Sequence, residues 1–362
     1  MKLRQFGLLT VLGFSWMSFS ARAEGGAVII PEPAQFCMQT YNAYGPLYAP
    51  ATRERMSWIG ALLIGMPRCS VIQLQEVWNN SNIDQIENSF KHQYSVSSPN
   101  RGQRIGVMSI FDSDIKSTET VTFKVNSEGG LLDKIRKALD VKKAFHVVRT
   151  ELFAMNEEFY FINVHLHPNS QAVRLTQILD MLNWRLQHQD LKVLMSGDFN
   201  ADESSFDREF MMATMGLHDT FQESLGGRYP DSLCTYCANN PHSWRLDNHV
   251  LDYIFVSNIG GADTHLKVQR GEINMRGPLR EPLSDHYGVR VYFTLESGQK
   301  LLLQDQQGAQ RNAMMAMLDH AVSVFSAQKA PEFAPYGQKA KALKQQLLDK
   351  QGDFNAYLEK FN

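Results

Sequence analysis

The residues best suited to chemistry follow short apolar stretches of the chain. Glu76 comes directly after the stretch 71–74, and Asp198 and Asn200 follow the stretch 193–195 across a glycine-containing turn. A carboxylate at a strand end is a suitable ligand for Mg²⁺, which prefers oxygen ligands and keeps several waters. A carboxylate and an amide two residues apart can orient a water molecule and hold a phosphoryl oxygen. Each of these features alone is also ordinary loop chemistry.

Histidines and carboxylates supply a second group of candidates. His165 and His167 alternate with apolar residues, so both lie on one face of a strand, where they could bind zinc or a phosphate oxygen. Asp252 lies within an apolar stretch, where an unpaired carboxylate would be costly, and a histidine is the obvious partner. Asp285 directly precedes His286 and could raise its basicity and fix its tautomer. His286 is then suited to take a proton from water.

Apolar stretches and helical spacing indicate the elements that must position these side chains. Short apolar runs bounded by turn residues predict buried strands over 70–75, 159–164, 191–195, 250–256 and 289–294. Helical spacing of apolar residues predicts helices over 51–66 and 171–188. Several candidate residues therefore stand at strand ends, which are rigid and open to solvent.

The composition changes after about residue 297. The segments 304–328 and 337–361 are rich in Gln, Ala, Lys and Leu, and Pro331 and Pro335 lie between them. They predict two helices joined by a turn. We expect residues 298–362 to form a helical extension that packs on the main domain, with a partner-binding or membrane-surface role as the alternative.

The first 23 residues have the pattern of a signal peptide. Lys2 and Arg4 give a basic start, an apolar stretch of 14 residues covers 6–19, and Ala21-Arg22-Ala23 fits a cleavage site. The apolar stretch is shorter than the roughly 20 residues needed to span a bilayer. We therefore expect a secreted or periplasmic protein with a loose leader over 24–35.

Charge argues mildly against nucleic acid as the partner. The full chain carries 36 basic and 38 acidic side chains, for a net charge of −2. Loss of the signal peptide leaves 33 basic side chains, so the net charge becomes −5. A protein that grips a nucleic-acid backbone usually shows a basic excess.

Four cysteines allow several arrangements in an exported protein. Cys234 and Cys237 could form a tight disulfide, a redox pair or half of a zinc site. The loop rich in Pro and Asn around them favours a structural disulfide. Cys37 with Cys69 is a second possible bridge.

Taken in order, the segments resemble the endonuclease/exonuclease/phosphatase superfamily. The segments that carry the resemblance are Thr40-Tyr41-Asn42, Gln75-Glu76-Val77, Asn163-Val164-His165, Gly197-Asp198-Phe199-Asn200, Leu251-Asp252-Tyr253 and Ser284-Asp285-His286. They span residues 36–297, which the resemblance makes the catalytic domain. It implies an α+β fold, a four-layer α/β/β/α sandwich of the deoxyribonuclease kind.

The resemblance also implies a metal-dependent phosphoric diester hydrolase. Glu76 would bind the essential divalent cation, Mg²⁺ with Mn²⁺ or Co²⁺ as alternatives, and Asn42 would lie beside it. His286 would be the general base that activates water, oriented by Asp285.

The remaining roles that the resemblance implies concern the phosphate. Asp198 and Asn200 would position the water and the phosphate. His165 would stabilise the charge that develops on the phosphate, and Asp252 would orient His165.

Within the superfamily, the chain most resembles the secreted neutral sphingomyelinases of bacteria. The resemblance rests on Tyr41-Asn42-Ala43-Tyr44-Gly45, on His165-Leu166-His167-Pro168 and on the loop from Asp231 to Pro241. It implies a phospholipid membrane surface as the substrate, with sphingomyelin cleaved to ceramide and phosphocholine. The alternatives are a secreted nuclease with a basic groove from Arg101, Arg104, Lys142 and Lys143, an inositol-phosphate phosphatase and a non-catalytic effector.

Overall fold

The computed structural model describes residues 35–349 except 47, 100, 102–103, 128–141, 153–154, 259, 277–280 and 299–303. The expected signal peptide, nearly all of the leader and the last part of the expected C-terminal helix lie outside the described residues. Everything below concerns the unit Pro33–Asn362.

One six-stranded sheet carries the N-terminal strand. Its strands, in spatial order, are β11 (Thr264–Asn274), β12 (Gly288–Ser297), β1 (Gln35–Asn42), β2 (Val71–Gln75), β4 (Met108–Phe111) and β3 (Ser95–Ser97). Strand β1 runs antiparallel to β12 and parallel to β2. The ends of β1 and β2 therefore lie side by side, with Asn42 opposite Gln75.

A second six-stranded sheet carries the middle of the chain. Its strands, in spatial order, are β5 (Ile115–Thr122), β6 (Ala144–Leu152), β7 (Glu157–His165), β8 (Lys192–Asp198), β10 (Asp252–Ser257) and β9 (His218–Asp219). Strands β7 and β8 are parallel, and β10 runs antiparallel to β8. The last residues of β7 and β8 therefore meet the first residue of β10.

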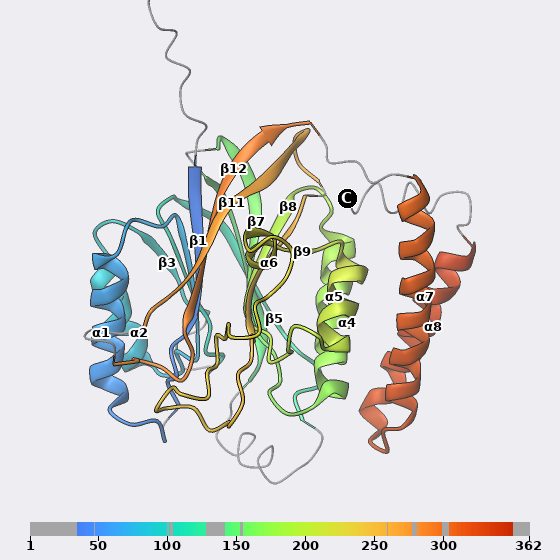
Figure 1. Cartoon of the computed structure of the whole chain (residues 1–362), viewed down its shortest axis with the longest axis horizontal. Helices are drawn as coiled ribbons and strands as arrows, with labels where there is room; N and C mark the ends of the chain where they lie inside the picture. Colours follow the sequence, from blue (N-terminus) through green and yellow to red (C-terminus); the bar gives the residue numbers. More distant parts are fainter. Residues whose placement is uncertain are drawn as a thin grey trace, which may run out of the picture. The chain divides into compact units, whose positions relative to one another are not determined.

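The two sheets pack face to face around an apolar core. Aromatic rings of the two sheets pack against one another. The ring centroids of Phe36 and Phe159 are 6.5 Å apart, and those of Phe111 and Phe161 are 5.3 Å apart. Helices α1 (Thr52–Gly65) and α2 (Asn80–Phe90) cover the first sheet, and α4 (Gln171–Gln187) and α5 (Phe206–Met215) cover the second (Figure 1). The predicted four-layer α/β/β/α sandwich is confirmed.

Two further helices lie outside the second helical layer. Helix α7 (Gln304–Ser326) packs on α4 and α5, and α8 (Ala334–Asp349) follows it after the short helix η2 (Pro331–Phe333) (Figure 1). The Tyr336 hydroxyl of α8 donates to the Asp180 carboxylate of α4. The second helix begins earlier than predicted because Pro335 fits in its first turn, where a missing N–H breaks no helical hydrogen bond. None of the helices among the described residues has the length and apolarity to cross a membrane.

Strands β5 and β11 carry little of the apolar signal on which the strand predictions rest. Each is the outermost strand of its sheet, and several of its residues are exposed. Edge strands of this kind are rich in polar residues, which also discourage pairing with other chains. Their sequences therefore resemble loops.

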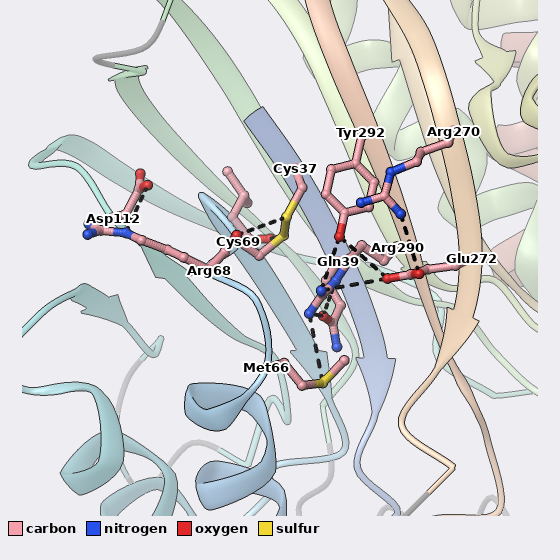
Figure 2. Close-up of a disulfide and its surroundings, with 11 residues drawn as sticks. Cys37, Gln39, Met66, Arg68, Cys69, Asp112, Arg270, Glu272, Arg290 and Tyr292 are labelled. Atoms are coloured by element: carbon pink, nitrogen blue, oxygen red, sulfur yellow. Dashed lines mark hydrogen bonds and ion pairs between the residues drawn. A yellow bond between two sulfur atoms is a disulfide. The ribbon is translucent and has the colours of Figure 1, made fainter. Parts of the chain in front are cut away.

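A disulfide and the buried side chain of Arg290 link the strands of the first sheet (Figure 2). Cys37 of β1 is bridged to Cys69, which lies just before β2. The Arg290 side chain of β12 is 1% exposed and donates twice to the Gln39 side chain of β1, at 2.9 and 2.6 Å. Its other terminal nitrogen lies 3.6 Å from the Glu272 carboxylate of β11. The disulfide ties β1 to the start of β2, and Arg290 ties β12 to β1 and β11. Strand β12 begins directly after the segment that bears His286.

Candidate active site

Three predicted site residues meet at one edge of the second sheet. His165 ends β7, Asp198 ends β8 and Asp252 begins β10, and Asp198 lies opposite both of the others in strand register. Only glycine fits at position 197, since an added Cβ would lie 1.8 Å from the Val164 carbonyl oxygen. The glycine thus permits the close approach of β7 and β8 that brings His165 beside Asp198.

The first sheet contributes Asn42 and Glu76 from the ends of β1 and β2. The Asn42 side chain donates to the Asp198 carboxylate at 2.9 Å, which joins the two sheets at the site. Glu76 has a φ of 60°, in the left-handed region that residues other than glycine and asparagine seldom adopt. Backbone strain of this kind is concentrated at functional sites.

A short segment before β12 places His286 between the two sheets. The Ser284 hydroxyl donates to the Asn42 carbonyl oxygen at 2.7 Å and accepts from the His286 N–H at 3.1 Å. Arg55 of α1 donates to the Leu283 carbonyl oxygen at 2.7 Å. The segment is therefore tied to both β1 and α1.

The structure corrects the predicted pairing of carboxylates with histidines. Nδ1 of His286 lies 2.7 Å from the carboxylate of Asp252, a hydrogen-bond distance, and both side chains are buried. Asp285 instead accepts from the Ser284 hydroxyl at 3.2 Å. Residues 283–286 form a bend, and the His286 ring in it lies against β10. The contact expected between Asp285 and His286 is thus replaced by one between Asp252 and His286.

His165 lies against two other carboxylates. Its Nε2 is 3.6 Å from Asp198 and 3.8 Å from Glu76, and its ring centroid lies 6.0 Å from that of Trp78. The predicted role of Asp252 in orienting His165 is thus replaced by its hydrogen bond to His286.

Asp198 and Asn200 stand together, as predicted from their spacing. The Asn200 N–H donates to the Asp198 carboxylate at 2.9 Å, and the Asn200 side-chain amide donates to the Leu166 carbonyl oxygen at 3.1 Å. Asp198 also lies 3.7 Å from Nε2 of His286. One carboxylate therefore faces both histidines and the asparagine from the other sheet.

The site concentrates buried negative charge. Burial, together with the charges of Asp285 and Asp198, raises the pKa of Glu76 to about 7. Burial also raises the pKa of Asp285 to about 6. These acids take up protons readily because their charged forms have lost most of their hydration.

Burial and the neighbouring carboxylates act in opposite directions on the pKa of His286. Burial alone would lower the pKa of its imidazole, but Asp252, Asp198 and Asp285 outweigh burial and raise the pKa well above its ordinary value. A general base must be deprotonated before it can act. Nearby positive charge would lower this pKa and favour the active form.

The residues present fit a divalent cation. Oε2 of Glu76 is buried and has no hydrogen-bond partner among the described residues. An ionised carboxylate in that state needs a compensating charge. Ligand atoms of Asp198, Asp252 and His286 also lie within 4.8 Å of one another and form a second candidate group. In that group Nδ1 of His286 already lies at hydrogen-bond distance from Asp252, so Glu76 is the better ligand.

Cation binding should depend on pH through Glu76. The pKa of Glu76 is about 7 in the folded protein, above its ordinary value of 4.5. The free energy of unfolding of the metal-free protein should therefore fall as the pH rises from 4.5 to about 7 and Glu76 ionises. A cation at Glu76 must displace a proton below pH 7, so its affinity should rise by about tenfold per pH unit there and then level off. The increase in Tm caused by Mg²⁺ should be larger at pH 8 than at pH 5.5, as measured by thermal unfolding.

The matched variant is Glu76→Gln, which keeps the shape and removes the charge. It should lose most of the Mg²⁺-dependent increase in Tm at both pH values. If Mg²⁺ raises the Tm of Glu76→Gln as much as that of the wild type, and by the same amount at both pH values, the cation binds elsewhere.

Comparison with known structures shows the fold. SmcL is 17% identical to this chain, and the match spans 72% of this chain and 99% of SmcL, with a TM-score of 0.54. Truncated TDP2 of Caenorhabditis elegans covers 72% of this chain and 97% of its own at 16% identity, with a TM-score of 0.54. A family protein of Bacteroides thetaiotaomicron covers 74% of this chain and all of its own at 17% identity, with a TM-score of 0.55.

No curated protein matches the sequence. The sequence model of the Endonuclease/Exonuclease/phosphatase family matches residues 40–286, a span that contains every residue placed at the site above. The chain therefore belongs to the Endonuclease/Exonuclease/phosphatase family.

Proposed function

We propose that this hydrolase is an exported, Mg²⁺-dependent phosphodiesterase that cleaves sphingomyelin to ceramide and phosphocholine at a membrane surface. The observation that carries the lipid assignment is a set of exposed apolar side chains on two segments that meet at Tyr44, near the site. We call it the apolar rim and define it as Tyr48, whose ring packs against Tyr44, Trp244, which donates to Tyr44, and Leu246, two residues after Trp244.

The apolar rim is exposed to an extent that is unusual for such side chains. Tyr48 is 75% exposed, Trp244 79% and Leu246 97%. Trp and Tyr are the residues that gather at membrane–water interfaces, because their rings are apolar and their tips are polar. An exposed group of this kind, next to a site that cleaves phosphate esters, suits a substrate embedded in a lipid surface.

Hydrogen bonds tie the apolar rim to the site. The Trp244 ring nitrogen donates to the Tyr44 hydroxyl at 3.2 Å, and Tyr44 lies two residues after Asn42. The Trp244 N–H donates to the Tyr236 hydroxyl at 2.7 Å, and the Tyr236 ring centroid lies 5.0 Å from that of His286. Trp244 is thus held by Tyr44, which lies close to Asn42, and by Tyr236, which packs on His286.

The disulfides support the export in this proposal. Disulfides join Cys37 to Cys69 and Cys234 to Cys237, and such bonds persist in oxidising compartments outside the cytoplasm. They suit the export that the signal-peptide pattern predicts.

In the proposed reaction, His286 takes a proton from a water molecule that attacks phosphorus. Its Nδ1 is held by Asp252, so Nε2, which faces Asp198, is the nitrogen that accepts the proton. Asp252 also stabilises the imidazolium that forms. Asp198 and Asn200 orient the water and the phosphate.

The phosphate gains negative charge as the new bond forms. His165, beside Glu76 and Asp198, is placed to offset that charge by hydrogen bonding or as a cation. Glu76, with Asn42 beside it, would hold Mg²⁺, which supplies further charge neutralisation and lowers the pKa of nearby acids. The bond between phosphorus and the ceramide oxygen breaks as the new bond forms, and ceramide leaves as an alcohol when that oxygen takes a proton from the His286 imidazolium or from solvent.

A secreted endonuclease is the second candidate, because TDP2 of D. rerio, solved with a single-stranded DNA product, shares the fold with a TM-score of 0.55 at 15% identity. The basic residues proposed for a nucleic-acid groove suit that role poorly. Arg101 pairs with Asp84 and Glu87, and Lys143 is buried and donates to the Leu166 carbonyl oxygen. Two of the four candidates are thus committed to contacts within the protein.

The hydrogen-bonded pair of Asp252 and His286, here called the proton relay, predicts different effects of substituting Asp252 and Asp285. Asp252→Asn should lower kcat on bis(p-nitrophenyl) phosphate by at least roughly 100-fold, since the imidazole loses the partner that fixes its tautomer. The same change should remove the low-field proton resonance of the Nδ1–H of His286 in the NMR spectrum. Asp285→Asn is the control and should keep that resonance. Loss of the resonance in Asp285→Asn with retention in Asp252→Asn would reverse the assignment.

The lipid substrate is tested by release of phosphocholine from sphingomyelin vesicles. Mature protein with Mg²⁺ should release it, and chelator should abolish release. His286→Ala should lower the rate by at least roughly 100-fold. Leu246→Ala should slow release from vesicles and leave hydrolysis of the soluble diester unchanged, whereas the exposed Leu348→Ala of α8 should affect neither.

Two results would reject the lipid assignment. One is an absence of head-group release from sphingomyelin and phosphatidylcholine vesicles by protein that hydrolyses the soluble diester. The other is Mg²⁺-dependent nicking of plasmid DNA that is lost in His286→Ala, which would favour the nuclease.

A further inference from the structure

The loop closed by the Cys234–Cys237 disulfide lies against both partners of the proton relay. Its central residues are Thr235, which is fully buried, and Tyr236, which is 7% exposed. Most loops run over the surface, because a buried loop needs partners for its backbone polar groups. The partners of Thr235 are the segments that carry Asp252 and His286.

The side chain of Thr235 holds the start of β10. Its hydroxyl oxygen accepts from the Leu251 N–H at 2.9 Å and from the Asp252 N–H at 3.2 Å. Asp252 is the first residue of β10, where sheet pairing has only begun. The hydroxyl thus fixes the backbone from which the Asp252 side chain reaches His286.

The backbone of Thr235 holds the segment that bears His286. Its carbonyl oxygen accepts from the Tyr287 N–H at 2.7 Å, one residue after His286. The next residue, Tyr236, packs edge-on against the His286 ring. One residue therefore links two segments that are 34 positions apart in the sequence.

The loop is itself held firmly. The N–H groups of Thr235 and Tyr236 donate to the His249 carbonyl oxygen at 2.9 and 3.0 Å, and the His249 N–H donates back to the Tyr236 carbonyl oxygen at 2.9 Å. The Cys234–Cys237 disulfide closes the loop around Thr235. Thr235 is therefore a fixed point to which both partners of the relay are attached.

We propose that Thr235 is a positioning residue, which acts through the Asp252–His286 pair by holding both of its segments in place. This inference rests on the proposed role of His286 as the base. Thr235 itself contacts neither the water nor the phosphate. Its loss should reduce the rate of the chemical step more than the binding of substrate, since a misplaced base loses catalysis while the binding surface remains.

The test uses the full mature protein with three substitutions. Thr235→Val keeps the shape and removes the hydroxyl, Thr235→Ser keeps the hydroxyl, and Thr176→Val removes a hydroxyl that is equally buried, in α4. On bis(p-nitrophenyl) phosphate with Mg²⁺, Thr235→Val should lower kcat by roughly 10- to 100-fold with KM within about twofold of wild type. Thr235→Ser should restore most of kcat, and Thr176→Val should keep it.

A second measurement does not depend on activity. The low-field NMR resonance of the Nδ1–H of His286 should broaden or disappear in Thr235→Val and persist in Thr235→Ser and Thr176→Val. If Thr235→Val fails to fold by circular dichroism, Thr235→Ala removes the hydroxyl without adding a methyl group and takes its place. Wild-type kcat together with an unchanged resonance in the folded variant would overturn the proposal.

The two measurements separate this inference from the proposed function. If the wild-type protein hydrolyses no phosphodiester, the proposed function fails, and the resonance still decides whether Thr235 holds the pair. If the wild type is active and Thr235→Val lowers kcat no more than Thr176→Val, the positioning role fails alone.

Discussion

Buried negative charge at the edge where two sheets meet is the constraint on which the site depends. Glu76, Asp198, Asp252 and Asp285 come together there, and all but Glu76 are at most 8% exposed. Carboxylates so placed are costly unless hydrogen bonds or positive charge offset them. Asn42 and His286 provide part of that compensation, and the unpartnered oxygen of Glu76 shows where a cation would provide more.

This constraint explains why the site draws on so many elements. Side chains of a single loop could not surround these carboxylates, so their partners come from β1, β2, β7, β8 and β10 and from the segment before β12. Strand register brings Asp198 opposite His165 and Asp252, and the hydrogen bond from Asn42 joins the sheets. The buried Arg290 then holds β12 against β1, so the site depends on contacts well away from it.

Much of the fold follows from patterns of apolar residues. The strands covered on both faces, such as β7, β8 and β10, are almost entirely buried and were predictable as apolar stretches. Strands β5 and β11 lie at sheet edges, where polar residues are tolerated, so the same signal is weak there. Helix α8 begins earlier than predicted because Pro335 is tolerated in its first turn.

The structure brings the predicted residues together, but their contacts could not be predicted from the sequence. The types of residue at strand ends indicated Glu76, His165, Asp198 and His286, whereas sequence proximity wrongly joined His286 to Asp285. Hydrogen bonding between Asp252 and His286 depends on how β10 meets the segment before β12, which local sequence does not encode. The same holds for the contacts of Thr235 with Asp252 and of Trp244 with Tyr44, which join segments that lie apart in the sequence.

The cation site at Glu76 is tested most directly by the anomalous scattering of Mn²⁺ in crystals soaked with that ion. We expect a peak at the carboxylate of Glu76, with the hydrogen bond between Asp252 and His286 intact. A peak bound to Nδ1 of His286 and to Asp252, with no ion at Glu76, would contradict it, because the pair would then be a metal site and not a proton relay.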